Sequence, residues 1–274
     1  MKKNIFAAIL AGLVICTAVA CSKTTTENND DSHGNNTEVS QLSEKPQFQM
    51  LVKDYPISVT DKNNEGLVYV SGTVRKASVV AQSREFSDIT KNINSVLLSA
   101  YNRNKTSGDE ILDIVSEAFT TEGFDVSTAM FPWSIDTNYE LVNNNGTVVT
   151  VKETVDYFAG GPHHTVSTYY YNFDCADGKH LAQILYTEGD DAQRDAADEL
   201  IYNKLKEKYG EDVINYDYIQ SSFVEAAVDT WYFTENGINV YFNQYEIAPY
   251  AAGDFEIEIT KAELPEAALK YFEG

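Results

Sequence analysis

Histidine and cysteine, the side chains used most often for metal binding and nucleophilic catalysis, are rare in this chain: its 274 residues include 4 His and 3 Cys. His163 and His164 are adjacent, so on a strand they point to opposite faces, and one metal ion rarely binds both. His180 is most simply a polar turn residue, and no third ligand follows at a recognisable spacing. We therefore expect no metal site and no cofactor.

Cysteine chemistry is equally limited. Cys175 lies in an expected strand beside Asp174 and Asp177, whose negative charges raise the pKa of a thiol. Cys16 and Cys21 lie near the amino terminus and leave Cys175 without an intramolecular partner. We expect Cys175 to be inert and partly buried.

Catalytic motifs are missing from the sequence. It contains no GxSxG, HExxH, P-loop or dinucleotide-binding pattern, and the pair Gly160-Gly161 precedes a proline rather than a helix. Glu246 would be a general acid if it were buried beside a second carboxylate, and Asp254 is near in sequence. Because the chain has 42 acidic residues, such proximity is expected by chance. We expect no enzyme activity, and a glycan hydrolase with an unrecognised carboxylate site is the alternative.

The run YEIAPYAAG at residues 245–253 has two interpretations. Pro249 and Gly253 are typical of a tight turn, in which Tyr245 and Tyr250 cover the edge of a core. A rigid loop that displays tyrosines and a carboxylate also suits contacts with a sugar or a protein. The candidate contact residues on this second interpretation are Tyr245, Glu246, Pro249 and Tyr250.

The first twenty residues are typical of a signal peptide. Lys2 and Lys3 precede an apolar run at residues 5–15, which is too short to cross a bilayer core of about 30 Å. Ala18-Val19-Ala20-Cys21 resembles a bacterial lipobox, in which the cysteine carries a diacylglycerol, although Ala18 stands where leucine is usual. The alternative is conventional cleavage after Ala20, which leaves Cys21 unmodified.

The next segment is expected to be a flexible polar tether, so that residues 21–45 comprise the anchor cysteine and its linker. Residues 22–45 contain Val39 and Leu42 but no aromatic residue, too little apolar surface to offset the entropy of ordering. The protein is thus expected to be attached to a membrane through lipidated Cys21, on the extracytoplasmic side of a bacterial cell envelope.

Charge and composition exclude several classes of protein. The apolar fraction of 43% and the 18 Tyr, 13 Phe and 2 Trp are sufficient for a sizeable core and exclude a disordered chain. Loss of the two leader lysines leaves 18 basic and 42 acidic residues, so the formal charge changes from −22 to −24. Such a charge repels phosphate, and we expect no binding to nucleic acid.

Hydrophobic periodicity predicts strands and helices in blocks. The first block contains strands at 48–60, 67–74, 139–142 and 147–158, with Pro56 typical of an edge strand and Asn144-Asn145-Gly146 of a hairpin turn. Between them, two amphipathic helices are expected at 86–101 and from 109 to Gly123. The second block contains a helix at 190–209 and strands at 166–174, 230–234, 238–243 and 255–260.

Such blocks favour an α+β fold with antiparallel sheets, packed helices and two subdomains. A boundary near Gly160-Gly161 divides the chain into domains at 46–159 and 160–274. A single continuous sheet across both is the alternative.

The second block resembles a known domain. Gly160-Gly161-Pro162-His163, Tyr171-Asn172-Phe173-Asp174, Trp231-Tyr232-Phe233 and the run from Tyr241 to Gly253 are similar to the C-terminal domain of RsiV-type, lysozyme-sensing anti-sigma factors and of some peptidoglycan deacetylases, a domain of unknown function. The family usually has Gly-Gly-Ala-His at the first of these motifs, and in this chain Pro162 stands in place of the alanine. Upstream, the layout is similar to the smaller domain that precedes it in that family, without a comparably sharp motif.

The resemblance implies a binding module of the cell envelope. In the deacetylases the catalysis belongs to a separate domain, which has no counterpart in this sequence. In the anti-sigma factors a cytoplasmic segment and a membrane-spanning helix precede the domain, so binding to a sigma factor does not transfer. The expected function is non-enzymatic binding of an extracytoplasmic partner, either a cationic protein such as lysozyme or peptidoglycan.

Overall fold

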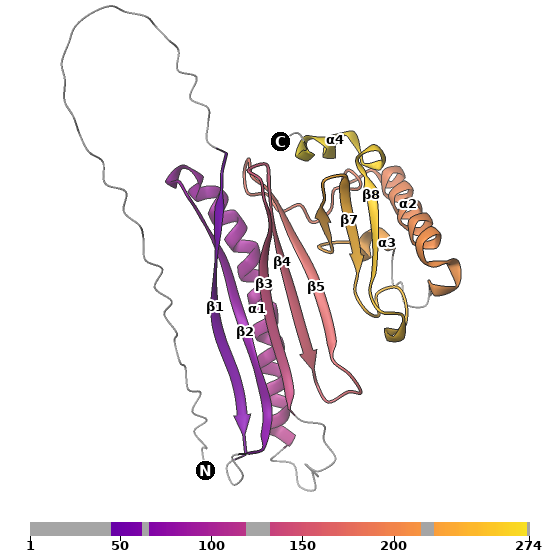
Figure 1. Cartoon of the computed structure of the whole chain (residues 1–274). Coiled ribbons are helices and arrows are strands. Elements are labelled where there is room, and N and C mark those ends of the chain that lie inside the picture. Colours follow the sequence, from indigo (N-terminus) through magenta and orange to yellow (C-terminus); the bar gives the residue numbers. More distant parts are fainter. Residues whose placement is uncertain (1–44, 62–65, 119–131, 215–221, 273–274) are drawn as a thin grey trace, which may run out of the picture.

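The computed structural model describes residues 45–61, 66–118, 132–214 and 222–272. The expected signal peptide, Cys21 and residues 22–44 of the tether lie outside these ranges, as does Gly123. In the described part of the chain, no helix has the length and apolar character needed to cross a membrane. The fold is α+β with two sheets and packed helices, as predicted (Figure 1).

The first sheet has five strands in the order β1-β2-β3-β4-β5. The strands are β1 (Phe48–Thr60), β2 (Val68–Ala81), β3 (Trp133–Asn144), β4 (Val148–Phe158) and β5 (Thr165–Asp174). Neighbours pair antiparallel except β2 and β3, which are parallel over four residue pairs. Pro56 lies in the edge strand β1 and the Asn144-Asn145-Gly146 turn joins β3 to β4, so both predictions are confirmed.

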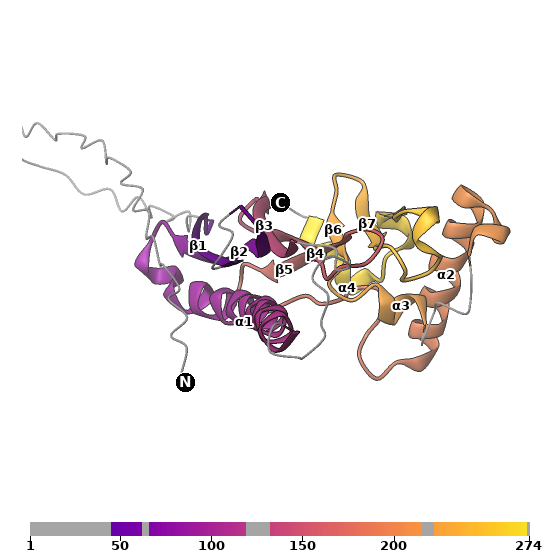
Figure 2. The same ribbon diagram turned by 90° about the horizontal axis from the view of Figure 1, so that it is seen from below.

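One long helix, α1 (Ser87–Ala118), covers one face of this sheet (Figure 2). The expectation of two separate helices is wrong, because Asn104 and Gly108 continue the buried stripe through a polar stretch. A Cβ atom at Gly108 would lie 3.4 Å from Val74 Cγ2, so glycine lets the helix lie close to the sheet. The seven buried residues are Ile93, Leu97, Ala100, Asn104, Gly108, Ile111 and Val115.

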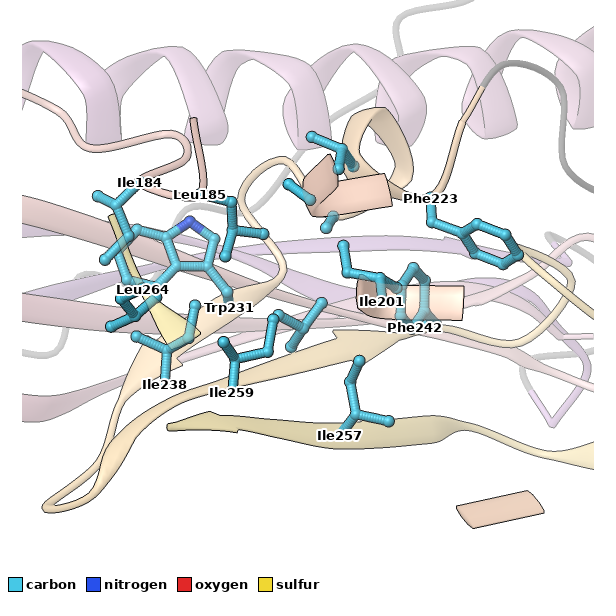
Figure 3. Packing of buried hydrophobic residues seen from close by; sticks show 14 of the residues in the cluster. Ile184, Leu185, Ile201, Phe223, Trp231, Ile238, Phe242, Ile257, Ile259 and Leu264 are labelled. Carbon is cyan, nitrogen blue, oxygen red and sulfur yellow. The ribbon is translucent and has the colours of Figure 1, made fainter. Parts of the chain in front are cut away.

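The second sheet has three antiparallel strands in the order β6-β7-β8. They are β6 (Trp231–Phe233), β7 (Gly237–Phe242) and β8 (Phe255–Thr260), within two residues of the predicted strands. Helices α2 (Asp191–Tyr209), α3 (Phe223–Ala226) and α4 (Glu266–Leu269) accompany this sheet. Short 3₁₀ helices lie at Arg84–Phe86, Glu211–Val213, Tyr250–Ala252, Lys261–Glu263 and Lys270–Phe272. Trp231, Ile238, Ile257 and Ile259 pack with residues of α2 and α3 in a core that Figure 3 shows.

Helix α2 begins and ends where the sequence predicts. The Asp190 side chain accepts a hydrogen bond from the Gln193 backbone N–H, and Gly210 follows the helix with φ +90°. Tyr209, the last residue of α2, binds the edge of the second sheet. Its hydroxyl donates to the Glu256 carbonyl and accepts from the Glu256 N–H, both at 3.0 Å. The outer edge of β8 is therefore partly covered by the helix.

The two sheets meet along the outer edge of β5. The Asn243 side-chain amide pairs with the backbone of Thr168 as a strand would, accepting from its N–H at 2.6 Å and donating to its carbonyl at 3.2 Å. The Tyr170 N–H donates to the Asp229 carbonyl at 2.6 Å, and Asn172 Nδ2 donates to the Trp231 carbonyl at 2.7 Å. Side-chain amides and loop carbonyls thus join the second sheet to the first.

The division between the sheets falls between β5 and β6. The expected boundary at Gly160-Gly161 lies in the loop between β4 and β5, which are paired along ten residue pairs of one sheet. The backbone groups on one edge of β5 form hydrogen bonds with β4, and groups on the other edge form hydrogen bonds with residues in or beside the second sheet. The first sheet therefore continues on both sides of those glycines.

Candidate binding surface

Two loops that are far apart in the sequence meet at one end of the fold. His163, in the β4–β5 loop, stacks on Tyr250, in the β7–β8 loop, with ring centroids 3.4 Å apart and planes 9° from parallel. The Tyr245 hydroxyl lies 3.0 Å from His163 Nε2. We call His163, Tyr245 and Tyr250 the His–Tyr cluster; it joins two of the segments that carry the resemblance described above.

The β4–β5 loop has a shape that only particular residues permit. Gly160 has φ +79°, and a Cβ atom there would lie 2.6 Å from Trp133 Nε1. Glycine is therefore required both by the backbone conformation and by the close approach of the indole. Pro162 follows and is exposed. The loop then presents His163, whose Nδ1 lies 3.1 Å from the His164 carbonyl.

The β7–β8 loop is likewise fixed by its backbone. Tyr245 has φ +71°, which is uncommon for a residue with a side chain. Gly253 has φ +77° and ψ −156°, a region used almost only by glycine. Between them, Ile247 and Ala248 are buried in the second core and anchor the loop. A rigid loop therefore holds Tyr245, which is 42% exposed.

The structure separates the four candidate contact residues. Tyr245 and Pro249 are exposed and Tyr250 is half-buried, whereas the half-buried Glu246 carboxylate accepts hydrogen bonds from Asn243. The bond from the Asn243 N–H is 2.7 Å and the bond from its Nδ2 is 3.1 Å. Burial raises the pKa of Glu246 and the charge of Asp254 adds to this, while the bonds from Asn243 act in the opposite direction. The loop thus has an exposed aromatic side and an inward carboxylate.

The remaining residues singled out in the sequence lie elsewhere. His164 pairs with Asp156 at 2.6 Å and stacks on Phe158, and His180 Nε2 lies 2.8 Å from Asp229 Oδ1. Among the residues that the structure describes, no three His, Cys, Asp or Glu side chains are grouped to hold a metal ion.

Cys175 matches its predicted character. Its side chain is 3% exposed in the core beneath α1. Burial, and secondarily the charge of Asp174, raise the pKa of Cys175 to about 12. At neutral pH the thiol is therefore protonated and unreactive.

A buried carboxylate escaped the sequence analysis. Glu153 in β4 is fully buried and accepts hydrogen bonds from Tyr139, Tyr171, Asn104 and Arg103. Burial, together with the charge of Glu153, raises the pKa of Tyr139 and of Tyr171. The network ties α1 to β3, β4 and β5, and its satisfied carboxylate is structural.

A signal for Glu153 is nevertheless present in the sequence. Glu153 lies between Val151 and Val155 on strand β4, and period-two alternation places all three on the face that meets α1. A charged residue within an otherwise apolar alternation indicates that a partner reaches it inside the fold. Arg103, in the polar stretch of α1, is the charged partner.

Two cavities among the described residues lie away from the Glu246 carboxylate. A cavity of about 570 Å³ is lined by residues of α2 and α3, among them Asp195, Asp198 and Tyr202. Another, of about 400 Å³, lies between α1 and the residues after β5 and includes His180. Neither contains Glu246, Asp254 or the His–Tyr cluster.

Comparisons with known proteins identify one domain and a solved structure with a similar fold. A crystal structure of a DUF3298 family member from Bacteroides fragilis has a TM-score of 0.59 and 14% sequence identity, covering 82% of this chain and 97% of its own. A DUF3298 family protein from Pseudomonas aeruginosa has a TM-score of 0.49 and 15% identity over 82% of this chain and 98% of its own. No curated protein matches the sequence. Residues 185–262 match the family model described as "Protein of unknown function (DUF3298)", so the chain contains a DUF3298 domain at these residues.

Proposed function

We propose that this protein is a lipid-anchored, non-enzymatic component of a bacterial cell envelope that binds an extracytoplasmic partner through the His–Tyr cluster. The observation that carries the proposal is the meeting of His163 with Tyr245 and Tyr250, which joins two loops by ring stacking and a hydrogen bond. Tyrosine offers a large amphipathic contact at low entropic cost and is enriched in protein interfaces. The loop backbone fixes the position of Tyr245, so little ordering is needed for such a contact.

The envelope part of the proposal rests on the sequence. The signal-like first twenty residues, Cys21 and the polar segment 22–45 together suit a folded module held at a distance from a lipid surface. The RsiV-type resemblance supports the same placement, because that domain acts outside the cytoplasm.

The partner is proposed to be a cationic protein such as lysozyme, or else peptidoglycan. A mature charge of −24 attracts basic proteins and repels the carboxylates of peptidoglycan, so charge favours the first. Electrostatic steering is lost as salt rises, because the Debye length falls from about 30 Å at 0.01 M to about 8 Å at 0.15 M. A contact at the His–Tyr cluster persists at the higher salt concentration.

The alternative function, an envelope glycan hydrolase, has weaker support. It requires Glu246 to act as an acid beside Asp254, and the raised pKa of Glu246 is suitable for that role. Both oxygens of Glu246, however, accept hydrogen bonds from Asn243, an arrangement that stabilises a loop. Release of soluble sugar from purified peptidoglycan, lost in Glu246→Gln, would favour the hydrolase.

The deciding experiment is a binding titration. The mature chain carrying Cys21→Ser is titrated with lysozyme and, separately, with soluble peptidoglycan fragments, at 0.01 M and 0.15 M salt. We expect saturable lysozyme binding with a Kd below about 100 μM, equivalent to about −5.5 kcal/mol, at the higher salt. Specific docking should also inhibit lysozyme on small chitooligosaccharides, which a diffuse charge effect would not do.

A matched pair of variants tests the surface. Tyr245→Ala should weaken binding at least tenfold, whereas Leu98→Ala, on α1 and 40% exposed, should leave it unchanged. Equal binding by the two variants would refute a role for the His–Tyr cluster. Saturable binding to peptidoglycan fragments alone would make the glycan the partner.

A further inference from the structure

Glu246 occupies an unexpected position for a recognition residue. It follows Tyr245 directly, yet both of its carboxylate oxygens are engaged by Asn243, at 2.7 Å and 3.1 Å. The same Asn243 amide pairs with the Thr168 backbone in β5, at 2.6 Å and 3.2 Å. A continuous path of four hydrogen bonds therefore runs from the loop that carries the tyrosines to the first sheet.

This path connects the two halves of the His–Tyr cluster. Thr168 lies in β5, five residues after His163, so the strand that anchors His163 also receives the Asn243 amide. Asn243 lies two residues before Tyr245, at the point where β7 ends. The Asn243 side-chain amide therefore links the strand that follows His163 to the loop that carries the tyrosines, and the Glu246 carboxylate binds that amide.

The carboxylate is retained at an energetic cost. Burial raises the pKa of Glu246, and neighbouring Asp254 adds a like charge. The Tyr241 hydroxyl bonds to Asp254 and belongs to the same cluster of groups. In the part of the chain that the structure describes, the Glu246 carboxylate interacts favourably with Asn243 and unfavourably with Asp254, so the bonds to Asn243 offset the cost of its burial.

We propose that Glu246 is a positioning residue for the His–Tyr cluster, acting through the clamp formed by Glu246, Asn243 and the Thr168 backbone, and is not itself a contact for the partner. The proposal rests on the proposed function for its biological meaning. The geometry of the clamp is tested without any partner.

Histidine ring signals provide the local readout. Stacking of His163 on Tyr250 at 3.4 Å places its ring protons in the shielding region of the tyrosine, so their NMR signals shift upfield. His164, which precedes β5 and stacks on Phe158, and His180, which follows β5, are internal controls. Spectra of the mature chain carrying Cys21→Ser are recorded at about pH 8, above the ordinary His pKa of about 6.5.

Glu246→Gln is the principal variant, because glutamine keeps the shape of the side chain. Its amide N–H₂ would face an N–H donor of Asn243, and one hydrogen bond would be lost. We expect the His163 signals to lose at least half of their upfield shift while those of His164 and His180 stay in place. Glu258→Gln, an exposed glutamate in β8, is the matched control and should change nothing. Unchanged His163 signals in Glu246→Gln would overturn the proposal.

A second variant covers loss of folding. If Glu246→Gln also displaces His180, Glu246→Asp is used; it keeps the charge but is too short to reach both donors, and it should displace His163 alone. Global unfolding of both variants would overturn the proposal, since the role would then lie in folding as a whole.

Lysozyme binding separates the two proposals. A displaced His163 with unchanged binding would refute the His–Tyr cluster as the binding surface and leave the positioning role intact. An undisturbed His163 with lost binding would make Glu246 a contact residue and overturn the positioning role.

Discussion

Replacing Glu153 with leucine should cost more stability than any single exposed change. Three buried donors, Asn104 Nδ2 and the hydroxyls of Tyr139 and Tyr171, lose their acceptor together. Each buried polar group left unsatisfied costs about 1–3 kcal/mol. The Arg103 side chain is 47% exposed and regains water, so it adds little. After the gain from burying leucine, we expect a loss of about 3–5 kcal/mol, as for other broken buried pairs.

The assay is denaturant and thermal unfolding of the mature chain carrying Cys21→Ser. For a fold of this size, the expected loss lowers Tm by about 6–20 °C. Glu140→Leu is the matched control, because Glu140 is exposed on the neighbouring strand, and it should change stability by less than about 0.5 kcal/mol. A loss below about 1 kcal/mol for Glu153→Leu would refute the claim that this network is fully buried and bonded.

Three further outcomes are expected. Cys21→Ser should move the protein from the membrane fraction to the soluble fraction, and continued detergent-dependent membrane association would contradict lipid anchoring. Gly253→Val should lower stability by about 1–3 kcal/mol because of its backbone angles alone, since nothing lies within 4 Å of the added Cβ atom. Ala252→Val, at the adjacent exposed position, serves as its control, and equal melting temperatures for the two variants would show that the loop adapts. Cys175, with its pKa raised to about 12, should react with iodoacetamide at pH 8 only after unfolding; rapid alkylation of the native protein would show that the core beneath α1 opens.

Local signals predicted the local structure well. The Asn144-Asn145-Gly146 turn gave the β3–β4 hairpin, and Asp190 and Gly210 marked the ends of α2. These features depend on capping and turn geometry within a few residues.

Features that depend on distant partners were not predicted. Helix α1 continues through Asn104 because that side chain has a buried acceptor in β4, about fifty residues away. The stack of His163 on Tyr250 and the pairing of Asn243 with Thr168 likewise join segments on different sheets. The sequence identified His163 and Tyr250 separately, but only the fold brings them together.

The amide of Asn243 also bears on the solubility of the protein. An uncovered strand edge offers N–H and C=O groups to any other chain and is a starting point for aggregation or domain swapping. In β5, Thr168 and Tyr170 already have their outward N–H groups occupied by Asn243 and by the Asp229 carbonyl. The Asn243 side chain, which orients the loop, therefore also covers part of the edge of β5. A substitution that releases the loop would at the same time expose backbone groups of β5 to pairing with another chain.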